Sequence, residues 1–174
     1  MMAVQKNKKL VLSAMFLGIG LVLPLLTSQI KEIGDTLLPM HFPVLLCGFL
    51  CGPGYGFAVG MVMPFLRSLL FGMPPIYPNG VWMALELATY GFAVGFLYSH
   101  FKHKRIREIY ISLITAMLAG RVVWGISKVI LLGIQGKTWT FSLFILGGFV
   151  DAFPGILLQL ILIPAIMKII QKWR

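Results

Sequence analysis

The chain contains little charge for its length. Asp, Glu, Lys and Arg make up 11% of its 174 residues, whereas soluble domains average about 25%. Acidic side chains are the scarcest, with five Asp and Glu against fifteen Lys and Arg. Hydrophobic residues account for 59% of the chain. This composition excludes an ordinary soluble domain and favours an integral membrane protein.

Several motifs of enzymes and metal proteins are also missing. The chain has no Gly-x4-Gly-Lys-Ser/Thr phosphate loop, so it does not hydrolyse ATP by that route. Neither His-Glu-x-x-His nor Gly-x-Ser-x-Gly occurs. The two cysteines, Cys47 and Cys51, are too few for a disulfide framework, and we interpret them as small core residues. We therefore predict no catalytic residue, no metal site and no cofactor.

The positive charges lie mostly at three places along the chain. Basic residues collect on the cytoplasmic side of membrane proteins. The three groups are the N-terminal lysines, the segment after the fourth apolar stretch and the C-terminus, namely Lys6, Lys8 and Lys9; Lys102, Lys104, Arg105 and Arg107; and Lys168, Lys172 and Arg174. We expect all three groups to be cytoplasmic. A topology with both termini inside explains the net charge without a nucleic-acid partner.

The apolar segments predict an all-α fold, a bundle of six transmembrane helices in one domain of residues 1–174. The expected helices cover residues 10–26, 40–51, 55–71, 81–99, 109–134 and 141–170. A bilayer span needs about 20 residues, so the segment 40–51 is short. The loops 27–39, 72–80 and 135–140 are expected outside the cell. Membrane lipid is expected to surround the helices.

Five charged residues lie inside these apolar segments, and each costs at least ~2.5 kcal/mol at the bilayer centre unless it is partnered. Helical rise places Arg67 near Glu86, and Arg121 near Asp151. Such pairs either stabilise the bundle or form part of a binding site. Lys128 leaves a surplus of one positive charge, which an anionic group on a ligand would balance.

Spacing groups further residues around these charges. Arg121, Trp124 and Lys128 share one helix face, because they lie at helical spacing. A second face carries Asn79, Trp82 and Glu86, and a stripe of small residues surrounds Asp151. Aromatic and rigid residues of the outer loops suit a lid over a cavity; they are His41, Phe42, Tyr77 and Trp139. His41 alone is typical of a histidine at the membrane interface.

One six-residue sequence, Tyr-Gly-Phe-Ala-Val-Gly, occurs twice, at residues 55–60 and 90–95. Each copy contains two glycines four residues apart. This spacing lets helix backbones approach closely in lipid. We therefore predict that the helices over 55–71 and 81–99 pack together where the two copies lie.

The chain resembles the substrate-binding S components of energy-coupling factor (ECF) vitamin transporters. The resemblance rests on six helices in under 200 residues and on short motifs along the chain. These are Leu-Leu-Pro-Met-His-Phe-Pro-Val at 37–44, Cys-Gly-Pro-Gly-Tyr-Gly at 51–56, Pro-Phe-Leu-Arg at 64–67 and Gly-Met-Pro-Pro at 72–75. Family members also carry a small-x3-small motif in the first helix, usually with two alanines. Here it reads Ala14 and Gly18.

The resemblance implies a non-enzymatic subunit in the plasma membrane of a prokaryote. It would capture a small water-soluble vitamin, and two ATPase subunits with a transmembrane coupling subunit would supply the energy. Ala14 and Gly18 would dock on the coupling subunit. The substrate site implied by the resemblance consists of Met40, His41, Pro75, Tyr77, Asn79, Trp82, Glu86, Arg121, Trp124, Lys128 and Asp151. The charge argument alone adds Arg67.

The substrate and two rival functions stay open at this point. The cationic surplus favours a carboxylate such as pantothenate. Glu86 and Asp151 would instead bind the hydroxyls and ring nitrogen of a pyridoxine-like or hydroxymethylpyrimidine-like compound, stacked on Trp82 and Trp124. One rival is a membrane transferase or protease that uses Asp151 or His41. The other is a channel or carrier that moves solute alone.

Overall fold

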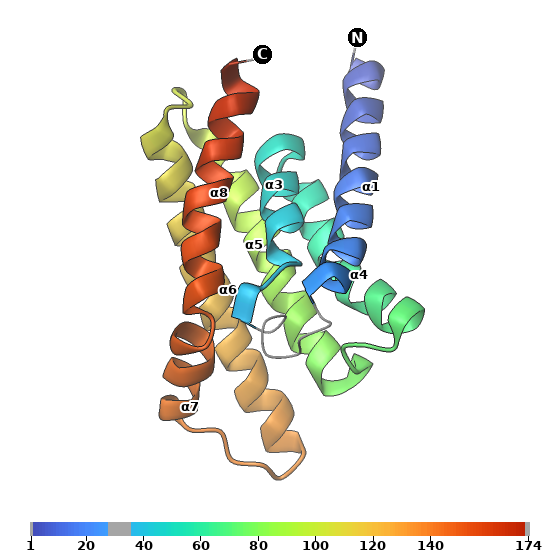
Figure 1. Ribbon diagram of the computed structural model, residues 1–174, viewed down its shortest axis with the longest axis vertical. Helices are drawn as coiled ribbons and strands as arrows, with labels where there is room; N and C mark the ends of the chain where they lie inside the picture. Colours follow the sequence, from blue (N-terminus) through green and yellow to red (C-terminus); the bar gives the residue numbers. More distant parts are fainter. Residues whose placement is uncertain (1, 28–35, 173–174) are drawn as a thin grey trace.

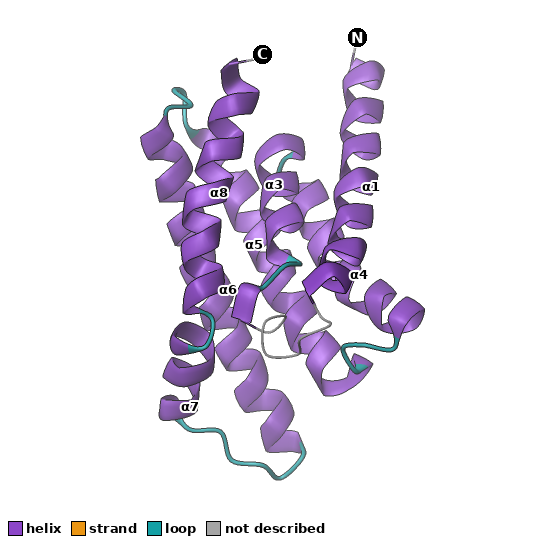
Figure 2. Cartoon of the chain, viewed as in Figure 1, coloured by secondary structure: helices purple, strands orange, loops and turns teal. Residues whose placement is uncertain are grey.

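The computed structural model describes residues 2–27 and 36–172, and within these ranges the chain forms helices, turns and loops but no strand (Figure 2). The helices are α1 (Met2–Thr27), α3 (His41–Cys51), α4 (Pro53–Phe71), α5 (Val81–His100), α6 (Ile106–Ile134), α7 (Phe141–Ile145) and α8 (Phe153–Lys172). Two short segments precede α5 and α8: η1 (Ile76–Gly80), in which Tyr77 has extended backbone angles, and η2 (Leu146–Val150), a wider helical turn.

Five helical segments of the described chain are long and apolar enough to cross a bilayer, which makes this an all-α membrane protein. They are α1, α4, α5 with η1, α6 and α8. One predicted span, over residues 40–51, is absent from these five. It corresponds to α3, which has only 11 residues. Most of its side chains are buried against α1, α4 and α5, so α3 is surrounded mainly by protein. Six membrane crossings stay a prediction.

The helix expected over 141–170 is broken, and in this respect the sequence prediction is wrong. It consists of α7, η2 and α8, with a turn at Asp151 and Ala152. Pro154 lacks a backbone N–H and cannot bond to the carbonyl four residues earlier. The adjacent Gly147 and Gly148 further weaken a continuous helix. Because of the break, α7 and η2 do not continue the axis of α8.

Both chain termini lie at one end of the bundle, and the α6–α7 connection lies at the opposite end (Figure 1). The loop after α4 and the η1 turn also lie toward that opposite end. This arrangement agrees with two termini on one side of the membrane. That this side faces the cytoplasm stays a prediction from the basic clusters.

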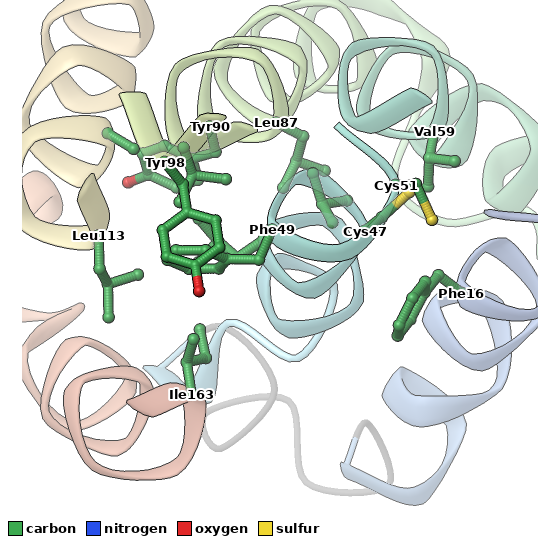
Figure 3. Close-up of a cluster of buried hydrophobic side chains, with 14 of the residues drawn as sticks. Phe16, Cys47, Phe49, Cys51, Val59, Leu87, Tyr90, Tyr98, Leu113 and Ile163 are labelled. Carbon is green, nitrogen blue, oxygen red and sulfur yellow. The ribbon is translucent and has the colours of Figure 1, made fainter. Parts of the chain in front are cut away.

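The apolar core lies between α1, α3, α4, α5, α6 and α8 (Figure 3). Cys47 and Cys51 are buried, free thiols within it, as predicted. The packing of the two repeat copies is also confirmed. A Cβ atom added to Gly56 would collide with the backbone of Gly91, so α4 and α5 meet backbone to backbone.

Candidate functional site

A buried ionic cluster connects three helices. Arg121 of α6 places its Nη1 atom 2.9 Å from Oε1 of Glu86, in α5. His41, the first residue of α3, places Nε2 3.6 Å from the same oxygen. These residues are 4%, 2% and 2% exposed, respectively. A buried charge in an apolar medium requires such a partner, so the pair explains how both ions are tolerated inside the bundle.

The cluster leaves several polar atoms without a hydrogen-bond partner in the described part of the chain. They include Nε and Nη2 of Arg121 and both ring nitrogens of His41. The His41 ring lies against Tyr90, with ring centroids 5.1 Å apart. Buried donors without partners cost about 1–3 kcal/mol each. The cluster can therefore accept a polar group from outside the protein.

A group of tryptophans surrounds the side chain of Lys128, seven residues after Arg121. The Nζ atom lies 4.2 Å from the ring centroid of Trp124, 4.9 Å from that of Trp82 and 5.7 Å from that of Trp139. Cations over aromatic faces gain about 0.5–2 kcal/mol each. Arg121 also lies over Trp124, with Cζ 5.7 Å from the ring centroid. The shared face of Arg121, Trp124 and Lys128 is thus confirmed.

A small cavity adjoins the cluster between α5, α6, η2 and α8. Its volume is about 110 Å³, and Arg121 is the one charged residue on its wall. The other lining residues are Tyr90, Ile114, Met117, Leu118, Phe149, Ile156 and Leu160. Ligand pockets usually measure about 300–1,000 Å³. The cavity therefore admits a group of a few non-hydrogen atoms, and a larger molecule requires movement of the walls.

The predicted pair of Arg67 and Glu86 is not formed. Nη1 of Arg67 donates a hydrogen bond of 3.1 Å to the backbone carbonyl oxygen of Leu21 in α1, and Cζ lies 5.8 Å from the ring centroid of Phe71. Pro24 interrupts the backbone bonding of α1 nearby. Broken backbone ladders in membrane helices are often satisfied by neighbouring side chains. Arg67 therefore contacts α1 and lies apart from the ionic cluster.

The predicted pair of Arg121 and Asp151 is also wrong. Asp151 is exposed, in the turn between η2 and α8, and forms no ion pair with a described residue. Its backbone N–H donates to the carbonyl of Leu146. The break in the expected helix turns this carboxylate outward. The stripe of small residues around it packs against protein, because Gly147 and Gly148 face the Trp124 ring.

The remaining candidate residues divide by burial. Met40 is part of the apolar core, and Trp82 is 9% exposed beside Lys128. Asn79 is half-buried in η1. Pro75 and Tyr77 lie exposed on the connection before α5, outside the cluster. His41 is deeply buried within the protein, and its depth in the membrane stays a prediction.

Two aromatic residues at the site and one buried amide in α8 were not among the predicted site residues. Tyr90 lies four residues after Glu86, so helical spacing could have placed it on the same face. Trp139 was predicted only as part of a lid in the outer loops, and its ring lies 5.5 Å from that of Trp124. Gln159 is fully buried in α8, and neither amide atom has a partner in the described residues. A lone amide in an apolar span is the signal that could have found it.

Residues 8–167 match the sequence model of a family described as "ECF transporter, substrate-specific component". The match covers nearly the whole chain and includes every residue of the ionic cluster. No curated protein and no solved structure matches the chain.

Proposed function

The chain belongs to the family of substrate-specific components of ECF transporters, and on this premise we propose that it captures a small water-soluble vitamin or vitamin precursor. Capture occurs outside a prokaryotic cell, at the end of the bundle away from the termini. The molecule then passes inward by means of an ATP-driven partner module in the plasma membrane.

The observation that carries this proposal is the buried Glu86–Arg121 pair beside His41. Three helices each contribute one polar side chain. Nε and Nη2 of Arg121 and the ring nitrogens of His41 have no hydrogen-bond partner in the described residues. A purely structural ion pair gains nothing from unsatisfied donors. Next to the cluster, Lys128 lies over the rings of Trp82 and Trp124 and adds a second positive charge. The combination is typical of a recognition site for a small polar molecule.

Energy must come from other subunits, since the sequence lacks a phosphate loop. We propose two ATPases and a transmembrane coupling subunit as partners. The exposed positions Ala14 and Gly18 on α1 support a docking surface there. A Cβ atom at Gly18 would meet nothing within 4 Å, so the backbone is open to a partner helix.

The proposal is tested on the protein purified from cells in detergent. Mass spectrometry of small molecules released by denaturation should identify a vitamin or precursor. In liposomes, the protein alone should bind that molecule without concentrating it. Addition of the ATPase and coupling subunits with ATP should produce accumulation.

The two rival functions give different results in the same experiment. A stand-alone carrier would move the solute without partners, and a membrane enzyme would convert it to a product. Either result would replace the proposed function.

A further inference from the structure

We infer that the captured molecule carries a single carboxylate, which binds the Nε–Nη2 edge of Arg121. The inference rests on the proposed function and specifies its substrate class. It depends on three observations: an unpaired edge of a buried guanidinium, an adjoining cavity, and the local balance of charge.

The guanidinium of Arg121 is only half used by the protein. Arginine presents its N–H donors in a rigid plane, and Nη1 is directed to Oε1 of Glu86 at 2.9 Å. The neighbouring donors Nε and Nη2 are buried and have no partner in the described residues. Arg121 is 4% exposed, so bulk water does not serve these donors. Two parallel N–H groups match the two oxygens of a carboxylate, which binds such an edge bidentately.

The cavity beside Arg121 has room for the carboxylate end of a ligand. Its volume is about 110 Å³ and its other walls are mainly hydrophobic, with Met117 and Phe149 among them. One water molecule occupies about 30 Å³ of liquid, so a carboxylate with one or two attached carbons fits. In this low-dielectric space a charged group needs a direct partner of opposite sign. Arg121 is the residue on the cavity wall that provides it.

The local charge balance favours one negative charge on the ligand. Among the described Asp, Glu, Lys and Arg side chains of the cluster, Arg121 and Lys128 oppose the single carboxylate of Glu86, which leaves a surplus of one positive charge. Since the Trp124 centroid lies 5.7 Å from Cζ of Arg121 and 4.2 Å from Nζ of Lys128, the two cations are at most about 10 Å apart. Both therefore count in the charge balance around the cavity.

This balance separates the substrate classes left open by the sequence. A monocarboxylate such as pantothenate neutralises the surplus. A pyridoxine-like or hydroxymethylpyrimidine-like compound has no carboxylate and leaves the Arg121 edge unpaired. A phosphate monoester carries about −1.5 to −2 charges at neutral pH and would exceed the surplus.

The inference is tested with matched pairs of probes that differ in the carboxylate. Binding of pantothenate and panthenol, nicotinate and nicotinamide, and biotin and biotin amide is measured by calorimetry on the wild-type protein in detergent, with pyridoxine and hydroxymethylpyrimidine added as neutral compounds. We expect one acid to bind at least tenfold more tightly than its neutral counterpart and more tightly than every other neutral probe.

Two variants then show whether Arg121 reads the carboxylate. Arg121→Gln should weaken binding of the acid at least tenfold more than it weakens binding of its neutral counterpart. The control is Arg67→Gln, which removes the other buried arginine and should preserve the discrimination. A monodisperse elution profile and a bound neutral probe confirm that each variant is folded.

Two outcomes overturn the inference but keep the proposed function. One is tightest binding by a carboxylate-free probe, and the other is equal weakening of acid and neutral probe by Arg121→Gln. If none of the eight probes binds at millimolar concentration, the inference fails, whereas the proposed function fails only if denaturation of the purified protein releases no vitamin or precursor.

Discussion

Two interfaces of the bundle use glycine in opposite ways. In the first, which we call the glycine seam, an added Cβ would meet backbone atoms of a neighbouring helix closer than 3 Å. The glycine seam joins α3, α4 and α5 and consists of Gly48, Gly56, Gly60, Gly91 and Gly95. In the second, the aromatic seam, an added Cβ would meet only side-chain rings. The aromatic seam joins α6 to α7 and η2 and consists of Gly125, Gly147 and Gly148 with the rings of Trp124 and Phe144.

The difference concerns what can move. Backbone in contact with backbone has no side-chain torsion to adjust, so the glycine seam fixes α3, α4 and α5 relative to one another. Rings move by rotation about their side-chain bonds while the backbone stays in place. The small cavity beside Arg121 lies on the side of the aromatic seam, with Phe149 of η2 in its wall. We therefore expect the walls that yield to a ligand to be those of α6, η2 and α8.

The largest effect should follow from a side chain placed in the glycine seam. Gly91→Leu forces α4 and α5 apart, because the new side chain overlaps the backbone of Gly56. Overpacking usually costs about 1–3 kcal/mol, and more where backbone must move. We expect at least about 3 kcal/mol of lost stability or failure to purify a monodisperse protein.

The matched control for Gly91→Leu is Gly133→Leu. Gly133 lies in α6, where an added Cβ meets nothing within 4 Å. Thermal unfolding in detergent, followed by tryptophan fluorescence, compares the two. If both variants unfold at the wild-type temperature, the glycine seam is not the rigid part of the bundle.

The second-largest effect concerns the Glu86–Arg121 ion pair, which joins α5 of the glycine seam to α6 of the aromatic seam. Glu86→Leu leaves Arg121 as a buried cation whose carboxylate partner is lost. Breaking a buried pair from one side costs about 3–5 kcal/mol, whereas replacing both partners with apolar residues is often neutral. We therefore expect Glu86→Leu to be unstable and Glu86→Leu combined with Arg121→Leu to regain most of the stability.

The double variant should still lose substrate binding, and this separates stability from recognition. Unfolding temperature and calorimetric affinity are measured on both variants. Recovery of binding in the double variant would show that the pair serves the fold alone.

A third kind of glycine is neither in the glycine seam nor in the aromatic seam. Gly18 is exposed on α1 and has open space around it. Gly18→Leu should leave the unfolding temperature and the vitamin affinity unchanged but prevent co-purification with the coupling subunit, since the leucine blocks close approach of a helix. Gly133→Leu, also exposed, should co-purify normally. Loss of vitamin binding in Gly18→Leu would indicate misfolding and not a docking defect.

Features that depend on spacing along one helix could be predicted from the sequence. The close approach at the repeated Tyr-Gly-Phe-Ala-Val-Gly sequence follows from glycine spacing, and the shared face of Arg121, Trp124 and Lys128 follows from helical periodicity. Charge inside apolar segments correctly indicated a buried ionic cluster. In each case the information is local, because a helix fixes the relation between residues three, four or seven apart.

Features that depend on helix rotation could not be predicted. Helical rise paired Glu86 with Arg67, but spacing along one helix cannot decide which neighbouring helix faces it. The partner of Arg67 is a backbone carbonyl, a group that every residue carries and no sequence pattern marks. Asp151 is exposed, and not inside the bundle as expected, because the chain turns at 151–152. The continuous hydrophobic run gives no sign of this break.

The smallest effect comes from two glutamines in the same helix. Gln171 of α8 donates hydrogen bonds of 2.8 Å to the Tyr98 hydroxyl and to the Lys104 carbonyl oxygen. Gln159, three turns earlier, is fully buried and its amide has no partner in the described chain. Gln171→Leu should therefore lose roughly 1–2 kcal/mol for its two bonds, whereas Gln159→Leu should be neutral or slightly stabilising.

Substrate affinity, measured in Gln159→Leu and Gln171→Leu, tests whether Gln159 contributes to binding. If the amide is only a buried polar group, Gln159→Leu binds like the wild type and unfolds at the same or a higher temperature. A tenfold loss of affinity without loss of stability would instead assign the unpaired amide to the substrate. That result would extend the polar site from α3, α5 and α6 to α8, the side of the bundle on which the walls are expected to move.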